Sequence, residues 1–157
     1  PVELAPEPTD LGQLVRDVAA LQRDLRVDLR VDRELAPVPA DPVRLRQVLT
    51  NLAANAREAT QTVVDPCLRV AVAQETDTVM IRLEDNGPGI PPEQRDHLFE
   101  PFIDQAKGSG LGLWVSFQIV SGLGGCIEVL PQDTGTRFLV RLPRSSAYPS
   151  RTEVSPP

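Results

Sequence analysis

The chain has 157 residues, of which 41% are hydrophobic and 24% charged, and it carries a formal net charge of −6. This length suits one domain with its own core, and the negative charge argues against nucleic acid, whose phosphates attract Lys and Arg. No apolar run approaches the roughly 18 residues that a membrane-spanning helix needs, so we expect no membrane contact and a cytoplasmic domain, whose parent protein can still be membrane-anchored.

The N-terminal quarter predicts a linker, a helix and a strand. Residues 1–9, with three prolines and no signal-peptide pattern, are expected to be a linker. Apolar residues at helical spacing predict a helix from Asp10 to about Leu25. Residues 27–31 alternate apolar and polar side chains as a half-buried strand does, and the two prolines in residues 34–40 are expected to interrupt regular structure.

A second helix and a hairpin follow. Asp41 can cap a helix whose first turn accepts Pro42, and this helix is expected to continue to about Thr60. Residues 68–73 and 78–84 alternate in the same way as the first strand and are joined by a short polar segment. They predict an antiparallel hairpin of two central strands.

The C-terminal part predicts a buried helix and a closing hairpin. Seven of the ten residues from 111 to 120 are apolar, which favours a helix buried on most sides. Residues 126–130 and 138–142 predict a hairpin or an edge-strand pair, and residues 144–157, rich in Pro and Ser, predict a disordered tail. The folded domain, residues 10–143, is thus expected to be a two-layer α/β sandwich, with a mixed, mostly antiparallel sheet covered on one face by three helices. Cys67 and Cys126 both lie beside strand-like sequence, so we expect them in the core.

The second helix carries a polar stripe beside its apolar one. The predicted buried stripe consists of Leu45, Val48, Leu49, Leu52, Ala56 and Ala59. Asn51 and Asn55 lie one turn apart on the adjoining stripe, although Asn is a poor residue for a helix interior. An amide oxygen facing hydrated Mg²⁺ would explain them. The alternative is that both amides are solvated or bind a neighbouring strand.

Two glycine clusters follow. Asp85 ends a strand before Gly87 and Gly89, which permit a positive φ and a close approach of ligand to backbone. A carboxylate repels phosphate but accepts a hydrogen bond from an exocyclic amine, so Asp85 suits the adenine end of a nucleotide. The alternative is a plain surface turn.

The second cluster contains Gly108, Gly110 and Gly112 and opens the C-terminal helix, where free amides can meet phosphate oxygens. Lys107 adds a positive charge. The Gly-x-Gly-x-Gly spacing, with no strand before it, argues against a dinucleotide-binding Rossmann fold. The long segment between the clusters, from Ile90 to Ala106, has the length of a functional loop and is interpreted as an ATP lid.

Together, the segments at 51–60, 84–92 and 107–113 resemble the histidine kinase catalytic domain, which shares the Bergerat ATP-binding fold with type II topoisomerases, Hsp90 and MutL proteins. The resemblance covers roughly residues 10–143. It implies that Asn55 is a Mg²⁺ ligand and that Asp85 binds the adenine amino group. Asn51 occupies the position where the other three branches have a Glu that activates water; an amide cannot take that proton, so phosphotransfer is expected in place of rapid hydrolysis.

The resemblance also assigns the remaining site residues. Thr136 is expected beside adenine, with Ala59 and Ile90 as walls of its pocket. The expected phosphate contacts are Lys107, Gly108, Gly110, Leu111 and Gly112. The segment around Phe99 and Phe102 resembles the F box, whose phenylalanines anchor the lid. The single histidine, His97, lies on the lid and is given a structural role.

The implied activity is transfer of the ATP γ-phosphate to a histidine on a separate dimerisation and phosphoacceptor helical segment, absent from this chain, and from there to a response regulator. Without that segment we expect a monomer. The alternatives are an ATP-dependent serine kinase and partner-binding regulator resembling the anti-sigma factors of the same fold, a degenerate scaffold without nucleotide, and a hydrolytic ATPase, which the missing Glu disfavours.

Overall fold

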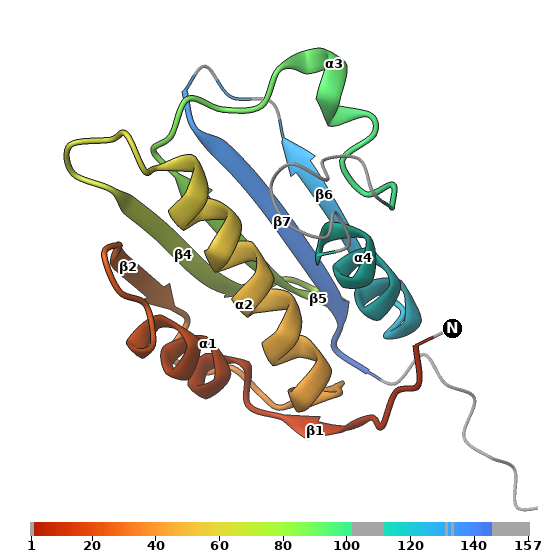
Figure 1. Cartoon of the computed structure of the whole chain (residues 1–157). Coiled ribbons are helices and arrows are strands. Elements are labelled where there is room, and N and C mark those ends of the chain that lie inside the picture. Colours follow the sequence, from red (N-terminus) through yellow and green to blue (C-terminus); the bar gives the residue numbers. More distant parts are fainter. Residues whose placement is uncertain (1, 102–111, 131, 133, 146–157) are drawn as a thin grey trace, which may run out of the picture.

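A computed structural model describes residues 2–101, 112–130, 132 and 134–145, and it has two layers (Figure 1). The main sheet has five strands in the order β2 (Arg26–Val31), β4 (Cys67–Gln74), β5 (Thr78–Asp85), β7 (Thr136–Pro143) and β6 (Cys126–Leu130). One face of this sheet is covered by α1 (Leu11–Ala20), α2 (Pro42–Ala59) and α4 (Gly112–Gly122). The β2–β4 pair is parallel and the other pairs are antiparallel. The predicted mixed α/β sandwich is confirmed.

The core lies between α2 and the inner face of the sheet. Every second residue of β5 points toward the helices, and Val79 and Ile81 are fully buried there. On α2 the buried residues are Leu45, Val48, Leu49, Leu52, Ala53 and Ala56. The predicted stripe was therefore wrong at its end: Ala53 is buried, whereas Ala59 is only half-buried. Ala59 is the last residue of α2, and its carbonyl oxygen lies against the turn at Gly87.

The N-terminal region differs from its prediction in three places: the end of the first helix, the segment expected to be a linker, and residues 34–40, where a short strand forms in place of the expected interruption. Helix α1 ends at Ala20 and not near Leu25. The Leu21 and Gln22 amides bond to carbonyl oxygens three residues back, and Asp24 then adopts a left-handed φ of 58° before β2. The segment expected to be a linker contains β1 (Glu7–Thr9), which pairs with β3 (Val38–Ala40) in a separate two-stranded sheet. Both strands have three residues and contain proline, so neither has a readable alternation.

The C-terminal helix is less enclosed than its composition predicts. Only Ser116, Ile119 and Val120 are buried in α4, and Phe117 is 38% exposed. The helix lies over β6, the edge strand, and among the described residues no further element is layered on its outer side (Figure 1). Cys67 is buried as predicted, but Cys126 is exposed, because on the edge strand its neighbour Ile127 takes the core-facing position.

The sheet face opposite the helices carries charged side chains in register. Glu84 of β5 is only 7% exposed, because arginines of three strands surround its carboxylate. Arg69 Nη2 lies 3.0 Å from Oε2, and Arg137 Nε lies 2.6 Å from Oε1 in an ion pair without hydrogen-bond geometry.

Among the helices that the structure describes, none is long and apolar enough to cross a membrane.

Candidate nucleotide site

Helix α2 brings the polar stripe predicted at Asn51 and Asn55 to the side of α4. The helix begins at Asp41, whose Oδ1 accepts a hydrogen bond from the Arg44 amide at 3.0 Å. Three turns later, Asn51 Nδ2 donates to the carbonyl oxygen of Gly112 at 3.4 Å. The hydroxyl of Ser116 donates to the same oxygen at 2.8 Å. Asn51 and the first residue of α4, predicted from separate motifs, thus lie side by side.

Asn55 lies one turn beyond Asn51 and is half-buried. Within the described ranges, its side-chain amide forms no hydrogen bond, so both of its polar atoms are available to a ligand. Mg²⁺ in nucleotide sites usually takes one or two protein oxygens, with water and phosphate oxygens completing its shell. One free amide oxygen fits that requirement. The residues that the structure describes contain no group of three or more His, Cys, Asp and Glu that could hold a metal ion.

The end of β5 positions Asp85 as a hydrogen-bond acceptor. Its Oδ1 accepts from the Gly87 amide at 2.9 Å, and Thr136 lies directly opposite Asp85 in the β5–β7 register. Burial raises the pKa of Asp85, and the hydrogen bonds from Gly87 and Thr136 oppose that shift. A desolvated carboxylate between a turn and a strand end gains from one further donor, such as an exocyclic amine.

Close backbone approaches join this turn to α2 and to β7. A Cβ atom at Gly87 would lie 2.6 Å from the carbonyl oxygen of Ala59, and one at Gly89, where φ is +86°, would lie 2.9 Å from that of Gly135. Gly135 has a φ of +74°, and a Cβ atom there would overlap the carbonyl oxygen of Asp85. Sequence reasoning missed Gly135, whose only signal is its place in a turn before Thr136.

Asn86, which the motif analysis also missed, fixes the same turn from the other side. Its Oδ1 accepts from the Cys67 amide at 2.9 Å, and its Nδ2 donates to the carbonyl oxygen of Asp65 at 2.8 Å. The turn is thereby held to the start of β4. An Asn before a Gly is common in ordinary turns, so the sequence offers no signal for this role.

The predicted lid begins with Ile90, which packs against the core, and its described residues, 90–101, include one short helix, α3 (Pro92–Arg95). Phe99 anchors it: its ring centroid lies 5.8 Å from that of Phe117 and 6.4 Å from that of Phe138. Exposed His97 lies 2.8 Å from Glu100, and that hydrogen bond raises the pKa of His97. Several predicted residues lie outside the described part: Phe102, Lys107, Gly108, Gly110 and Leu111.

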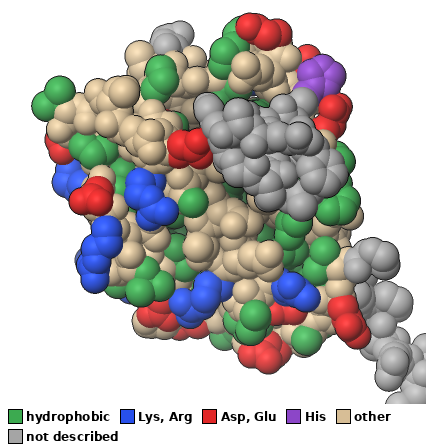
Figure 2. All heavy atoms as spheres, in the orientation of Figure 1, with side chains coloured by type: hydrophobic (Ala, Val, Ile, Leu, Met, Phe, Trp, Pro, Cys, Tyr) green, Lys and Arg blue, Asp and Glu red, His purple; other side chains and the backbone are tan. Residues whose placement is uncertain are grey.

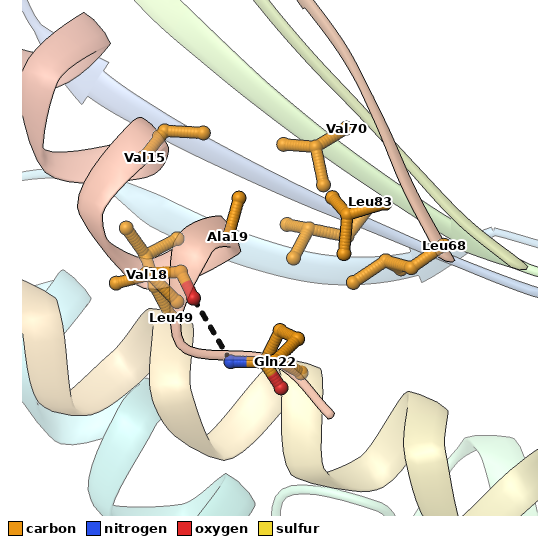
Figure 3. Close-up of a pocket in the computed structure, with 10 residues that line it drawn as sticks. Val15, Val18, Ala19, Gln22, Leu49, Leu68, Val70 and Leu83 are labelled. Carbon is orange, nitrogen blue, oxygen red and sulfur yellow. Dashed lines mark hydrogen bonds between the residues drawn. The ribbon is translucent and has the colours of Figure 1, made fainter. Parts of the chain in front are cut away.

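An apolar cavity of about 20 Å³ lies on the opposite side of α2, between α1 and the sheet (Figure 3). Leu49 and Ala53 of α2 line it together with Val15 and Val18 of α1. Its volume equals roughly one water molecule, so it is a packing gap and takes no part in the nucleotide site. On the face that carries the helices, the described arginines are scattered among acidic side chains (Figure 2).

A family model described as histidine kinase-, DNA gyrase B-, and HSP90-like ATPase matches residues 40–146. The sensory histidine kinase/phosphatase NtrB of Rhizobium meliloti is 36% identical over 151 residues, which cover 87% of this chain and 40% of that protein. The chain therefore spans less than half the length of this relative.

Solved structures show the same architecture. The catalytic domain of the histidine kinase ThkA superposes with a TM-score of 0.82 at 28% identity, covering 91% of this chain and 98% of that domain. ThkA in complex with the response regulator TrrA matches with a TM-score of 0.74 at 26% identity, covering 88% of this chain and 42% of that chain. Full-length ShkA in complex with AMPPNP matches with a TM-score of 0.81 at 29% identity, covering 94% of this chain and 33% of that chain.

Proposed function

The chain belongs to the family of histidine kinase-, DNA gyrase B- and HSP90-like ATPases, as the ATP-binding catalytic domain of a sensor histidine kinase, and we propose that it holds Mg-ATP and passes the γ-phosphate to a histidine on a separate helical segment. The observation that carries this proposal is the meeting of four segments that the sequence keeps apart. The ends of α2 and β5 and the starts of β7 and α4 converge through Ala59–Gly87, Asp85–Thr136 and Asn51–Gly112.

At the adenine end, the Asp85 carboxylate accepts a hydrogen bond from the exocyclic amine of the base, and Thr136 holds the carboxylate in place. Ala59 and Ile90 form walls of the pocket, and Gly87 and Gly89 let the base approach the backbone. Guanine has a carbonyl oxygen where adenine has its amine. Two acceptors would then face each other, so Asp85 selects ATP over GTP.

At the phosphate end, the amides of Gly108, Gly110, Leu111 and Gly112 meet the phosphate oxygens, and Lys107 adds a positive charge. Asn55 would supply an oxygen ligand to Mg²⁺, which would offset the negative charge of the phosphates. Asn51, held against Gly112, fixes the start of α4 beside these groups. Catalysis is then positioning and charge stabilisation, because phosphoryl transfer asks for little covalent chemistry from the protein.

Asn51 also decides between the two fates of ATP. Its amide cannot accept a proton from water, so hydrolysis by the domain alone is slow and the phosphate is retained for an acceptor. The acceptor is a histidine on a dimerisation segment of two helices, and the next recipient is an Asp of a response regulator. We place the domain in the cytoplasm and expect residues 1–157 alone to be monomeric; a dimer in sedimentation at micromolar concentration would contradict the latter.

The test is a transfer assay with γ-labelled ATP, in which the chain is mixed with the phosphoacceptor segment of NtrB, and the catalytic domain of NtrB serves as the positive control. We expect label on the segment that is labile to acid and stable to alkali, as a phosphohistidine is. Acid-stable label would instead indicate the serine kinase that resembles anti-sigma factors. No transfer by the chain, with transfer by the control, would contradict the proposal for this acceptor.

A further inference from the structure

The carboxylate of Asp41 makes two contacts with different parts of the chain. Its Oδ1 caps α2 through the Arg44 amide, and its Oδ2 accepts from the Ala5 amide at 2.8 Å. The Asp41 residue is only 5% exposed, and both bonds are partly buried. A helix cap needs one oxygen. Through its second oxygen, Asp41 holds the N-terminal segment at the start of α2.

The same segment also contacts the end of α4. A Cβ atom at Gly122 would lie 2.7 Å from Cδ1 of Leu4, so the leucine side chain rests directly on this glycine. Val2 and Leu4 pack against the core, and β1 pairs with β3 immediately before Asp41. We call residues 2–9 the N-terminal strap. It joins the N-terminal end of α2 to the C-terminal end of α4 (Figure 1).

The opposite ends of these two helices carry the nucleotide site. Asn51 and Asn55 lie in the second half of α2, and Gly112 is the first residue of α4. The helices pack against each other and are joined at the site by the bond from Asn51 to Gly112. Because a helix moves as a stiff element, a shift at Asp41 or Gly122 changes how α2 and α4 meet at the site.

We propose that the N-terminal strap sets the spacing of α2 and α4, and that Asp41 and Leu4 are positioning residues for the nucleotide site. The inference rests on the proposed ATP binding. Coupling between two sites is reciprocal, so nucleotide tightens the strap to the same degree that the strap strengthens nucleotide binding. A pull on residues 2–9 from a preceding segment would therefore weaken the hold on ATP.

The experiment measures hydrogen exchange of the Ala5 amide by NMR in the whole chain, with and without Mg-AMPPNP, together with the Kd for AMPPNP. We expect AMPPNP to slow exchange at Ala5 by about fivefold or more, the lower end of typical coupling. Asp41→Ser keeps a capping oxygen but cannot also hold Ala5, so its Kd should rise by about the same factor. Asp10→Ser is the matched control, because the Asp10 side chain caps α1 through Gln13 and has no second hydrogen-bond partner among the described residues.

Leu4→Ala provides a second variant that leaves the cap of α2 untouched, and its Kd should also rise. A residue with a purely structural role would lower stability without making Ala5 exchange depend on nucleotide. If AMPPNP binds the unmutated chain and Ala5 exchange does not change, or if both variants bind AMPPNP as tightly as Asp10→Ser does, the inference is wrong while the proposed function stands. If AMPPNP does not bind at all, the proposed function fails and this inference fails with it.

Discussion

Gly87 lies directly beneath the last residue of α2, so close that a Cβ atom at position 87 would be 2.6 Å from the carbonyl oxygen of Ala59. Two backbone segments meet there, and neither has a flexible side chain that could give way. The turn that follows Asp85 is thus packed against the helix that carries Asn51 and Asn55. This contact fixes the distance between the proposed adenine and metal ends of the nucleotide site.

Gly87→Ala should therefore lower stability and weaken ATP binding together. Forcing a methyl group against backbone costs roughly 1–3 kcal/mol in unfolding free energy. The comparison is Gly112→Ala, whose added Cβ atom would meet Asn51 at 3.8 Å, an ordinary contact. That variant should keep its urea midpoint, and its unfolding free energy should change by at most about 0.5 kcal/mol. Its affinity for ATP should still fall. Equal urea midpoints for the two variants would contradict the steric account.

Asp85→Asn should lose adenine binding without losing stability at neutral pH. Burial raises the pKa of Asp85 above its ordinary value of 3.8, so in the pH range between these two values the folded state holds more protons than the unfolded state. Stability therefore falls as pH rises through that range, and it stays lower above it. Asn does not titrate and can still accept from Gly87.

The check on this prediction is urea unfolding of both proteins between pH 3 and pH 7. The stability of Asp85→Asn relative to the unmutated chain should increase as pH rises through the interval that starts near 3.8. A relative stability that instead decreased with pH would show that the carboxylate is stabilised where it lies. The proposed function would then have to explain why no further donor is needed.

Much of the fold could be predicted because its longer strands alternate and because two helices, α1 and α2, begin after a capping Asp. β4 and β5 appeared as alternating segments, and α2 was marked by Asp41 and Pro42 at its start. β1 and β3 could not be found, since three residues are too few to show a period. The exposure of Cys126 depends on β6 being an edge strand, and strand order is a tertiary property that local sequence does not contain.

Candidate site residues could be proposed from the sequence where a residue type is unusual in its local structure, and not where a residue's contacts are distant in the sequence. Two asparagines inside a helix and an Asp before a glycine turn are such unusual residues. Asn86 and Gly135 look like ordinary turn residues until β4 and β7 are placed beside them. Asp41 was identified as a cap, but its second bond, to Ala5, joins residues 36 positions apart.

Asn55→Ala should leave stability nearly unchanged, within about 0.5 kcal/mol, because the half-buried amide has no hydrogen bond to lose among the described residues. If Asn55 is a Mg²⁺ ligand, the variant should lose the increase in ATP affinity that Mg²⁺ provides while retaining the affinity measured in EDTA. Titrations in Mg²⁺ and in EDTA separate the two effects. Asn55→Ala with an undiminished response to Mg²⁺ would remove Asn55 from the metal site.

Ile81→Ala and Met80→Ala test the one-sided core. Ile81 is fully buried on the helix-facing side of β5, and its truncation should cost roughly 2–5 kcal/mol in unfolding free energy. Met80, the preceding residue, is half-buried on the opposite face of the sheet. Its truncation should lower the unfolding free energy by clearly less than that of Ile81. Chemical denaturation of the two variants gives both values. Similar losses would mean that both sheet faces are packed.

The most direct test of the proposed function is calorimetric titration of ATP with Mg²⁺ into the unmutated chain and into Asp85→Asn, with GTP as the control nucleotide. We predict that the unmutated chain binds ATP and not GTP, and that Asp85→Asn, folded as judged by its unfolding transition, binds neither with measurable affinity. Equal binding of ATP and GTP, or unchanged ATP binding by Asp85→Asn, would contradict the assignment of Asp85 to adenine, and no binding by the unmutated chain would contradict the nucleotide site itself.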